Sequence, residues 1–85
     1  MPHYAGQRFW IAYARLPPEV RALADKNFAL LKQNAQHPSL DLKKVGTYWS
    51  VRVGLGHRAL GTQIEAGIQW FWIGPHREYN RLIKS

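Results

Sequence analysis

The sequence predicts an α+β domain in which two N-terminal helices pack on an antiparallel sheet of three or four strands, followed by a short C-terminal helix. Up to residue 33, apolar residues recur at three- and four-residue steps, which is the spacing of one helix face. Between residues 48 and 73, short apolar runs are separated by glycine-containing turns, as in antiparallel strands. Helices followed by a run of strands are typical of an α+β domain. We therefore expect residues 1–85 to form a single domain with its helices on one face of a twisted sheet.

The first helix is expected from Arg8 to Leu16, after a short segment in which Pro2 and Gly6 favour fraying. A strand remains the alternative, because the apolar residues between positions 9 and 13 also alternate. A second, longer helix is expected to begin near Pro18, since proline is well tolerated in a first helical turn. Its apolar stripe is the clearest helical pattern in the chain and consists of Val20, Leu23, Ala24, Phe28 and Leu31.

The sheet is expected to follow a loop at residues 34–42, in which Pro38 opposes regular structure. A short edge strand would begin at Lys43, and three longer strands would span residues 48–54, 57–64 and 68–73. In the last strand we expect Ile68, Trp70 and Trp72 on one face and Phe71 with Ile73 on the other. The residues assigned to the core include the tryptophans Trp49, Trp70 and Trp72. Residues 77–83 are expected to form the final helical turns.

The composition is strongly basic, with 12 Lys and Arg residues against five Asp and Glu and a net charge of +7. Such a domain attracts polyanions, either nucleic acid and the ribosome or one acidic protein. Cysteine is absent, and no apolar run approaches the roughly 20 residues of a membrane-spanning helix. The four histidines are too scattered to suggest a metal site. We expect a cytoplasmic protein without cofactor, metal or membrane association.

Basic and histidine side chains gather where one end of the predicted sheet should lie. His57 and Arg58 open one strand, whereas His76 and Tyr79 follow the next, so an antiparallel arrangement brings the four together. Arginine holds a phosphate and offsets charge in a transition state, and histidine transfers protons near neutral pH. With an RNA 2′-hydroxyl as nucleophile, this set needs no metal. The candidate catalytic residues are Arg52, Arg58, His76 and Tyr79, and the candidate RNA-binding residues are Lys43, Lys44, His57 and Arg77.

Each of these residues also has a structural interpretation. Arg52 lies on the polar face of its strand, where solvated arginines are common. His57 stands in a turn, where histidines are more often structural than catalytic. Tyr79 on a terminal helix is more often a core residue. The pattern by itself therefore leaves open whether this cluster performs chemistry or binds a partner.

Several segments, read together, resemble the RelE/ParE superfamily of toxins of bacterial type II toxin–antitoxin systems, in particular its HigB- and RelE-like members. The matching segments cover about residues 9 to 83 and include HPSL at 37–40, WSVRVG at 49–54, HRAL at 57–60 and WFWIGPHREY at 70–79. The resemblance implies a RelE-like fold and a cognate antitoxin as partner. It also implies a ribosome-dependent endoribonuclease that cleaves messenger RNA through attack of the 2′-hydroxyl, with Arg52, Arg58, His76 and Tyr79 at matching positions.

Two departures from the family pattern leave an alternative open. Ser50 stands where the nucleases often carry a second basic residue, which favours a non-catalytic ParE-like inhibitor or a basic binding module with the same fold. The N-terminal strand usual in the family is expected to be missing, because the first helix begins so early. An absent strand would leave a sheet edge open for a partner or for a homodimer. If Arg58 were paired with Glu65 or Glu78, the binding module would gain further support.

Overall fold

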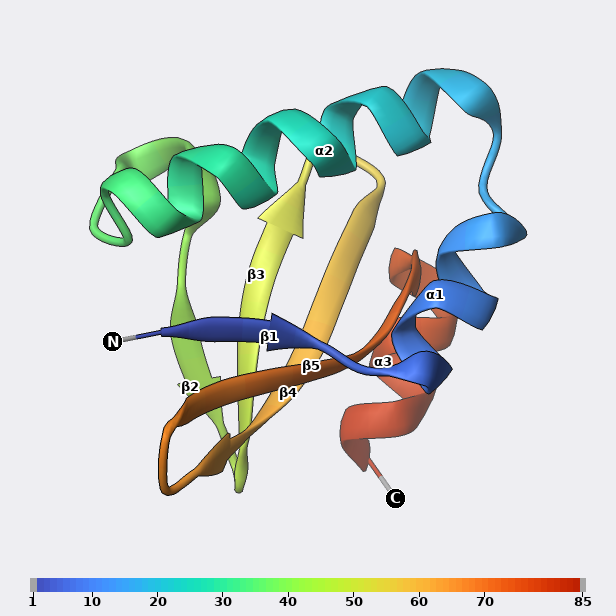
Figure 1. The fold of residues 1–85 in the computed structure, drawn as a ribbon. Helices are drawn as coiled ribbons and strands as arrows, with labels where there is room; N and C mark the ends of the chain where they lie inside the picture. Colours follow the sequence, from blue (N-terminus) through green and yellow to red (C-terminus); the bar gives the residue numbers. More distant parts are fainter. Residues whose placement is uncertain (1, 85) are drawn as a thin grey trace.

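The computed structural model describes residues 2–84 and contains a five-stranded mixed sheet with helices against both of its faces (Figure 1). The strands lie in the order β1-β5-β4-β3-β2. Neighbouring strands are antiparallel except for β1, which runs parallel to β5. The elements in chain order are β1 (His3–Ala5), α1 (Gln7–Ala14), α2 (Pro18–Gln33), a 3₁₀ turn (Pro38–Leu40), β2 (Lys43–Val45), β3 (Tyr48–Val53), β4 (His57–Ile64), β5 (Gly67–Pro75) and α3 (His76–Lys84).

Both predicted N-terminal helices are present, and the helical interpretation of the first segment is confirmed over the strand. Helix α2 begins at Pro18, with Glu19 in its first turn, where a carboxylate complements the helix dipole. It ends at Gln33, and the backbone N–H of the C-cap residue Asn34 donates to the Leu30 carbonyl at 2.7 Å. No helix within residues 2–84 is long and apolar enough to cross a membrane.

The expected absence of an N-terminal strand is wrong. Residues His3–Ala5 form β1, which pairs with β5 so that His3 lies opposite Ile68 and Ala5 opposite Trp70. Three residues are too few to show an alternating pattern in the sequence. The strand is stabilised by its hydrogen bonds to the edge of β5. Strand β1 therefore occupies the edge of β5 along Ile68–Trp70, and the outer strands of the sheet are β1 and β2. The homodimer expected through an open edge stays a prediction. The sheet is therefore mixed and five-stranded rather than antiparallel with three or four strands.

The helices cover both faces of the sheet, not one face as expected. Helices α1 and α2 cover the side on which Val51 and Val53 are buried. Helix α3 lies on the opposite side, where Tyr79 contacts Ser50. The core between α1, α2 and the sheet consists of Phe9, Leu16, Val20, Ala24, Leu31, Leu40, Val51, Val53, Ala59, Ile68, Trp70 and Ile73. A basic terminal helix with a single buried residue thus covers the second face.

A β-bulge changes which aromatic residues of β5 are buried. The register places Leu60 opposite Trp72 but Gly61 opposite Trp70, so Phe71 is the extra residue on β5. Alternation is interrupted there, and Ile73 joins Trp70 in the core, whereas Trp72 turns to the α3 side. The expected sharing of one face by Trp70 and Trp72, and the core assignment of Trp72, are therefore wrong.

The loop before β2 is more ordered than expected. Pro38 begins a 3₁₀ turn instead of excluding regular structure, and the His37 side chain accepts the backbone N–H of Ser39 at 3.2 Å. Leu40 at the end of this turn is completely buried. This anchor fixes the next residue, Asp41, beside the start of β2.

Candidate functional site

The face of the sheet that carries α3 presents three rows of side chains across β3, β4 and β5. The register aligns Arg52 with Arg58 and Gly74, then Ser50 with Leu60 and Trp72, then Tyr48 with Thr62 and Gln69. Helix α3 covers part of the middle row, because Tyr79 is buried against Ser50. The row of arginines lies at the end of the sheet where β4 begins, β5 ends and α3 starts.

This end of the sheet is hollowed, and most of the predicted site residues meet there. The hollow has a volume of about 470 Å³, and we refer to it as the basic hollow. The prediction that the start of β4 lies beside the end of β5 is confirmed by the pairing of His57 with Pro75 and by a 2.9 Å hydrogen bond from the His76 N–H to the Gly56 carbonyl. The basic hollow is lined by Asp41, Lys43, Val45, Arg52, Leu55, His57, Arg58, His76, Tyr79, Asn80 and Ile83.

Arg58 is buried at the floor of the basic hollow, with 4% of its surface exposed. Its Nη1 donates to Ser50 Oγ at 2.9 Å, and its Nη2 donates to the carboxylate of Asp41. Neither Glu65 nor Glu78 pairs with it. Asp41 also lies 3.6 Å from Arg52 Nη2 and 3.8 Å from Lys43 Nζ, so one carboxylate faces three cations.

Tyr79 is directed into the sheet rather than toward the opening of the hollow. It is 3% exposed, and its Oη accepts a hydrogen bond from Ser50 Oγ at 3.1 Å. The Arg58 guanidinium lies 5.5 Å from the ring centroid, and the His76 ring meets the same ring edge-on at 5.3 Å. Ser50, Arg58 and Tyr79 thus form one buried polar chain that also positions His76.

Two of the predicted RNA-binding residues lie elsewhere. Lys44 is on the opposite face of the sheet, where its Nζ sits 5.6 Å from the Trp49 ring. Arg77 is exposed at the start of α3 and does not line the basic hollow. The alternation of β2 explains the first case, because Lys43 and Lys44 must face opposite ways.

Sequence reasoning missed Asp41, the residue that organises the cations. It is one of only five acidic residues and stands two positions before Lys43, but aspartate in a proline-containing loop is ordinarily a turn former. Its role depends on a left-handed backbone, with φ 44° and ψ 49°, which aims the carboxylate at β3 and β4. No local sequence pattern indicates the direction in which this carboxylate points.

The charges of the basic hollow favour a bound anion. Three cations face a single carboxylate, and two histidines line the same space. Arginine guanidinium groups match the geometry of phosphate oxygens. Among residues 2–84 no group of three His, Cys, Asp or Glu side chains is placed to hold a metal ion. The residues present can therefore bind a phosphodiester, and a histidine beside it can exchange a proton.

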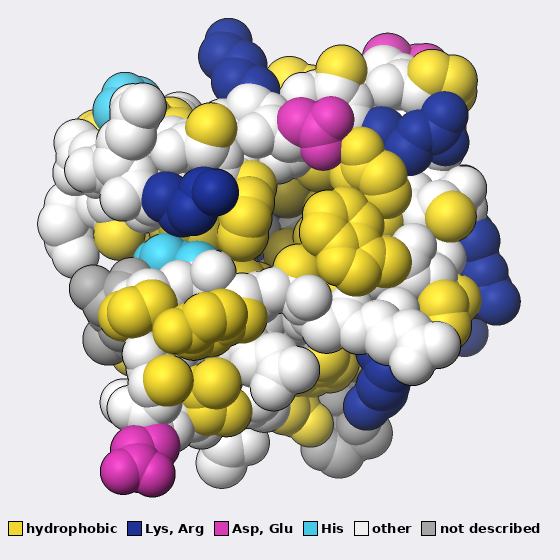
Figure 2. Space-filling view, viewed as in Figure 1, with side chains coloured by type: hydrophobic (Ala, Val, Ile, Leu, Met, Phe, Trp, Pro, Cys, Tyr) yellow, Lys and Arg dark blue, Asp and Glu magenta, His cyan; other side chains and the backbone are white. Residues whose placement is uncertain are grey.

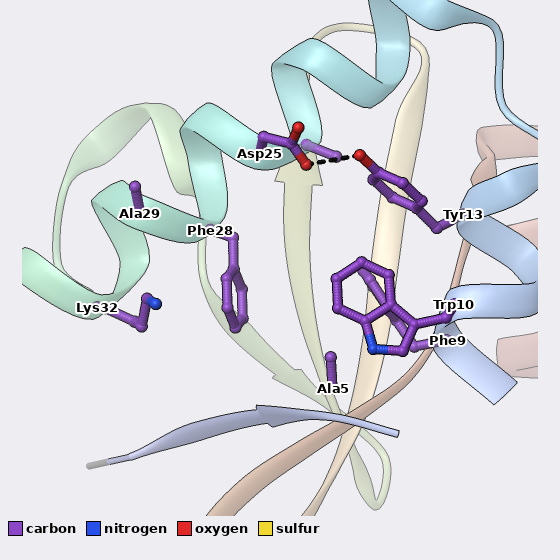
Figure 3. Close-up of a pocket in the computed structure, with 9 residues that line it drawn as sticks. Ala5, Phe9, Trp10, Tyr13, Asp25, Phe28, Ala29 and Lys32 are labelled. Atoms are coloured by element: carbon purple, nitrogen blue, oxygen red, sulfur yellow. Dashed lines mark hydrogen bonds between the residues drawn. The ribbon is translucent and has the colours of Figure 1, made fainter. Parts of the chain in front are cut away.

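A second hollow lies on the other side of the molecule and has a different chemistry. It measures about 230 Å³ between β1, α1 and α2, and its walls include Phe9, Trp10 and Phe28 (Figure 3). Apolar side chains gather around it on the face that Figure 2 shows. On its rim the hydroxyl of Tyr13 donates to Asp25 Oδ1 at 2.8 Å, and this hydrogen bond raises the pKa of Tyr13. An apolar groove of this kind suits binding rather than catalysis.

The fold is similar to that of a solved structure. The chain superimposes on a chain of the crystal structure of the RelB–RelE antitoxin–toxin complex from Methanococcus jannaschii with a TM-score of 0.72, covering 93% of this chain and 96% of that chain. Sequence identity over the match is 14%. No protein-family model matches the sequence, and no curated protein sequence matches it. The RelE-like fold expected from the sequence is thus confirmed.

Proposed function

We propose that this protein is the toxin component of a toxin–antitoxin pair and acts as a ribosome-dependent endoribonuclease on messenger RNA. The observation that carries the proposal is the convergence of Arg52, Arg58, His57 and His76 in one basic hollow. The RelE-like fold supports the same assignment. A cognate antitoxin is the protein partner that this function requires.

The bond changes of the proposed reaction involve the RNA, these side chains and water, whereas the ribosome is where the messenger RNA is cleaved. The 2′-hydroxyl of a nucleotide attacks the adjacent phosphorus, the bond to the 5′-oxygen of the next nucleotide breaks, and a cyclic phosphate forms. Arg52 at the mouth and Arg58 at the floor offset the charge that develops on the phosphate oxygens. His76, which is exposed beside them, takes the proton that the 2′-hydroxyl loses, and the departing 5′-oxygen takes up a proton from water. Tyr79 holds His76 and Arg58 in position through its ring.

A second candidate function is supported by the contacts of Tyr79 and Ser50. In this alternative the same hollow only binds an acidic partner, as in a ParE-like inhibitor. Two features favour it, because the Tyr79 hydroxyl is engaged inside the sheet and Ser50 is completely buried, so neither group faces a substrate. The basic hollow would then supply electrostatic attraction without chemistry.

Induced expression of the full chain distinguishes the two functions. Growth would be followed together with messenger RNA ends for wild type, Arg52→Ala and His76→Ala. Arg15→Ala is a matched control, since Arg15 is exposed at the end of α1 and away from the basic hollow. Growth arrest with new RNA ends that both site variants abolish supports the nuclease. Arrest without RNA ends supports the binding function, and absence of arrest with well-folded protein refutes the toxin proposal.

A further inference from the structure

Asp41 is the only carboxylate among residues 2–84 that lines the basic hollow. Its Oδ2 accepts from Arg58 and lies 3.6 Å from Arg52 Nη2 and 3.8 Å from Lys43 Nζ. The three cations come from β4, β3 and β2, so a single oxygen atom lies beside positive charges from three strands. A phosphate oxygen would require the same convergence of donors.

The position of Asp41 is maintained by an uncommon backbone conformation. It is the one non-glycine residue with a positive φ in the described part of the chain. Such a conformation is rare outside glycine, although aspartate and asparagine tolerate it better than most residues. The buried Leu40 fixes the backbone on one side, and β2 begins two residues later on the other. The side chain of Asp41 remains 39% exposed, so it lies at the mouth of the hollow above the nearly buried Arg58.

We propose that Asp41 occupies the phosphate subsite in the free protein and that a phosphodiester of single-stranded RNA displaces it. The inference rests on the anion-binding part of the proposed function and not on cleavage. Without an anion, three neighbouring cations would repel one another, and Asp41 relieves that repulsion. When a phosphate binds, the exposed carboxylate rotates into solvent, while Arg58 stays anchored by Ser50. Asp41 is therefore an internal competitor that weakens RNA binding.

The test is the affinity of purified Asp41→Asn protein for a short single-stranded RNA with 2′-O-methyl riboses, which prevent cleavage. Asparagine keeps the size of the side chain, tolerates the left-handed backbone and still offers Arg58 an acceptor oxygen, so mainly the charge changes. Binding to RNA and to inorganic phosphate would be measured at about 0.15 M salt. We expect at least about fivefold tighter binding of RNA, since the phosphate no longer has to displace a unit negative charge that lies about 4 Å from the cations.

Asp25→Asn provides the matched control, because it makes the same change in net charge outside the basic hollow. Screening beyond roughly 8 Å should hold its effect below about twofold. If Asp41→Asn binds RNA no more tightly than Asp25→Asn, Asp41 only positions Arg58 and the proposal is overturned. Tighter binding of inorganic phosphate without tighter binding of RNA would reassign the subsite to a small anion and overturn the RNA assignment.

A second variant guards against misfolding. Asp41→Gly introduces the residue that the left-handed backbone prefers and removes the carboxylate altogether. The same gain in RNA affinity is expected from it. If thermal unfolding shows that neither variant is folded at 25 °C, Asp41 is a structural clamp rather than a displaceable competitor. Tighter RNA binding by Asp41→Asn, combined with a wild-type protein that produces no new messenger RNA ends in a translation reaction, would sustain this inference while refuting the nuclease.

Discussion

Replacement of Tyr79 by phenylalanine separates a structural role of this residue from a chemical one. The change removes only Oη, which accepts the 3.1 Å hydrogen bond from Ser50 Oγ, and retains the ring that contacts Arg58 and His76. Ser50 is completely buried, so its hydroxyl loses an acceptor that water does not replace. A buried donor without a partner costs about 1–3 kcal/mol. Because the hydroxyl points into the sheet, we expect the proposed RNA cleavage to be retained in this variant.

The loss of stability should be visible in thermal unfolding followed by circular dichroism. In a domain of this size, each kcal/mol lowers the melting temperature by about 4–8 °C. Tyr13→Phe is the control, since it removes a tyrosine hydroxyl that bonds Asp25 at an exposed site away from the basic hollow, and its effect should be much smaller. Ser50→Ala should remove most of the additional effect of Tyr79→Phe when the two changes are combined, because the two residues share one hydrogen bond.

The opposite result would refute this reasoning. If Tyr79→Phe has the melting temperature of wild type but no longer cleaves RNA, the hydroxyl takes part in the reaction. Its hydrogen bond with Ser50 must then break when substrate binds. The family resemblance of the late tyrosine would then describe the mechanism better than the contacts of the free protein. Ribosome-dependent cleavage, measured as new messenger RNA ends in a translation reaction, is the matching readout.

Two further predictions concern the attachment of β1. Gly67→Ala should detach it, because Gly67 has a φ of 154° and an added Cβ would stand 2.2 Å from the Pro2 carbonyl oxygen. Hydrogen exchange of β1 and β5 amides should accelerate far more than in Gly46→Ala, where φ is also positive but space is open, and equal effects would contradict the argument. Acid should loosen the same strand, since burial lowers the pKa of His3, whose Nδ1 accepts from Trp70 Nε1 at 3.2 Å. The unfolded chain then binds more protons than the folded one. The contribution of His3 to the free energy of unfolding is therefore present above its ordinary pKa of 6.5 and is lost as the pH falls through the lower folded pKa. Denaturation curves at several pH values should show a smaller loss of stability in acid for His3→Gln than for wild type.

Local patterns account for the elements that were predicted correctly. The stripe from Val20 to Leu31 and the proline at position 18 determine α2, because both act within a few residues. Alternation in β3 likewise identified Val51 and Val53 as core residues. Pairing of consecutive antiparallel strands then sufficed to predict that His57 and Arg58 meet His76 and Tyr79.

The errors occurred where distant segments decide the outcome. Strand β1 owes its existence to the edge of β5, more than 60 residues away, and the bulge at Phe71 depends on the register with β4. The sequence also did not determine the side of the sheet on which α3 lies, because Tyr79 is the one buried residue of this helix in the described part of the chain. Packing of this kind is a property of the assembled sheet and leaves no periodicity in either partner.

The sequence by itself determined the order of helices and strands from α1 to α3, the positive charge and the end of the sheet at which the basic residues gather. Only the tertiary structure decided which of those residues share a space, because β2 turns Lys43 into the basic hollow and Lys44 away from it. It also decided that Asp41 opposes three cations, since a left-handed residue beside the buried Leu40 aims that carboxylate across three strands. Charge and periodicity are local properties of the sequence, whereas the direction of a side chain in a loop depends on the tertiary contacts that the loop makes.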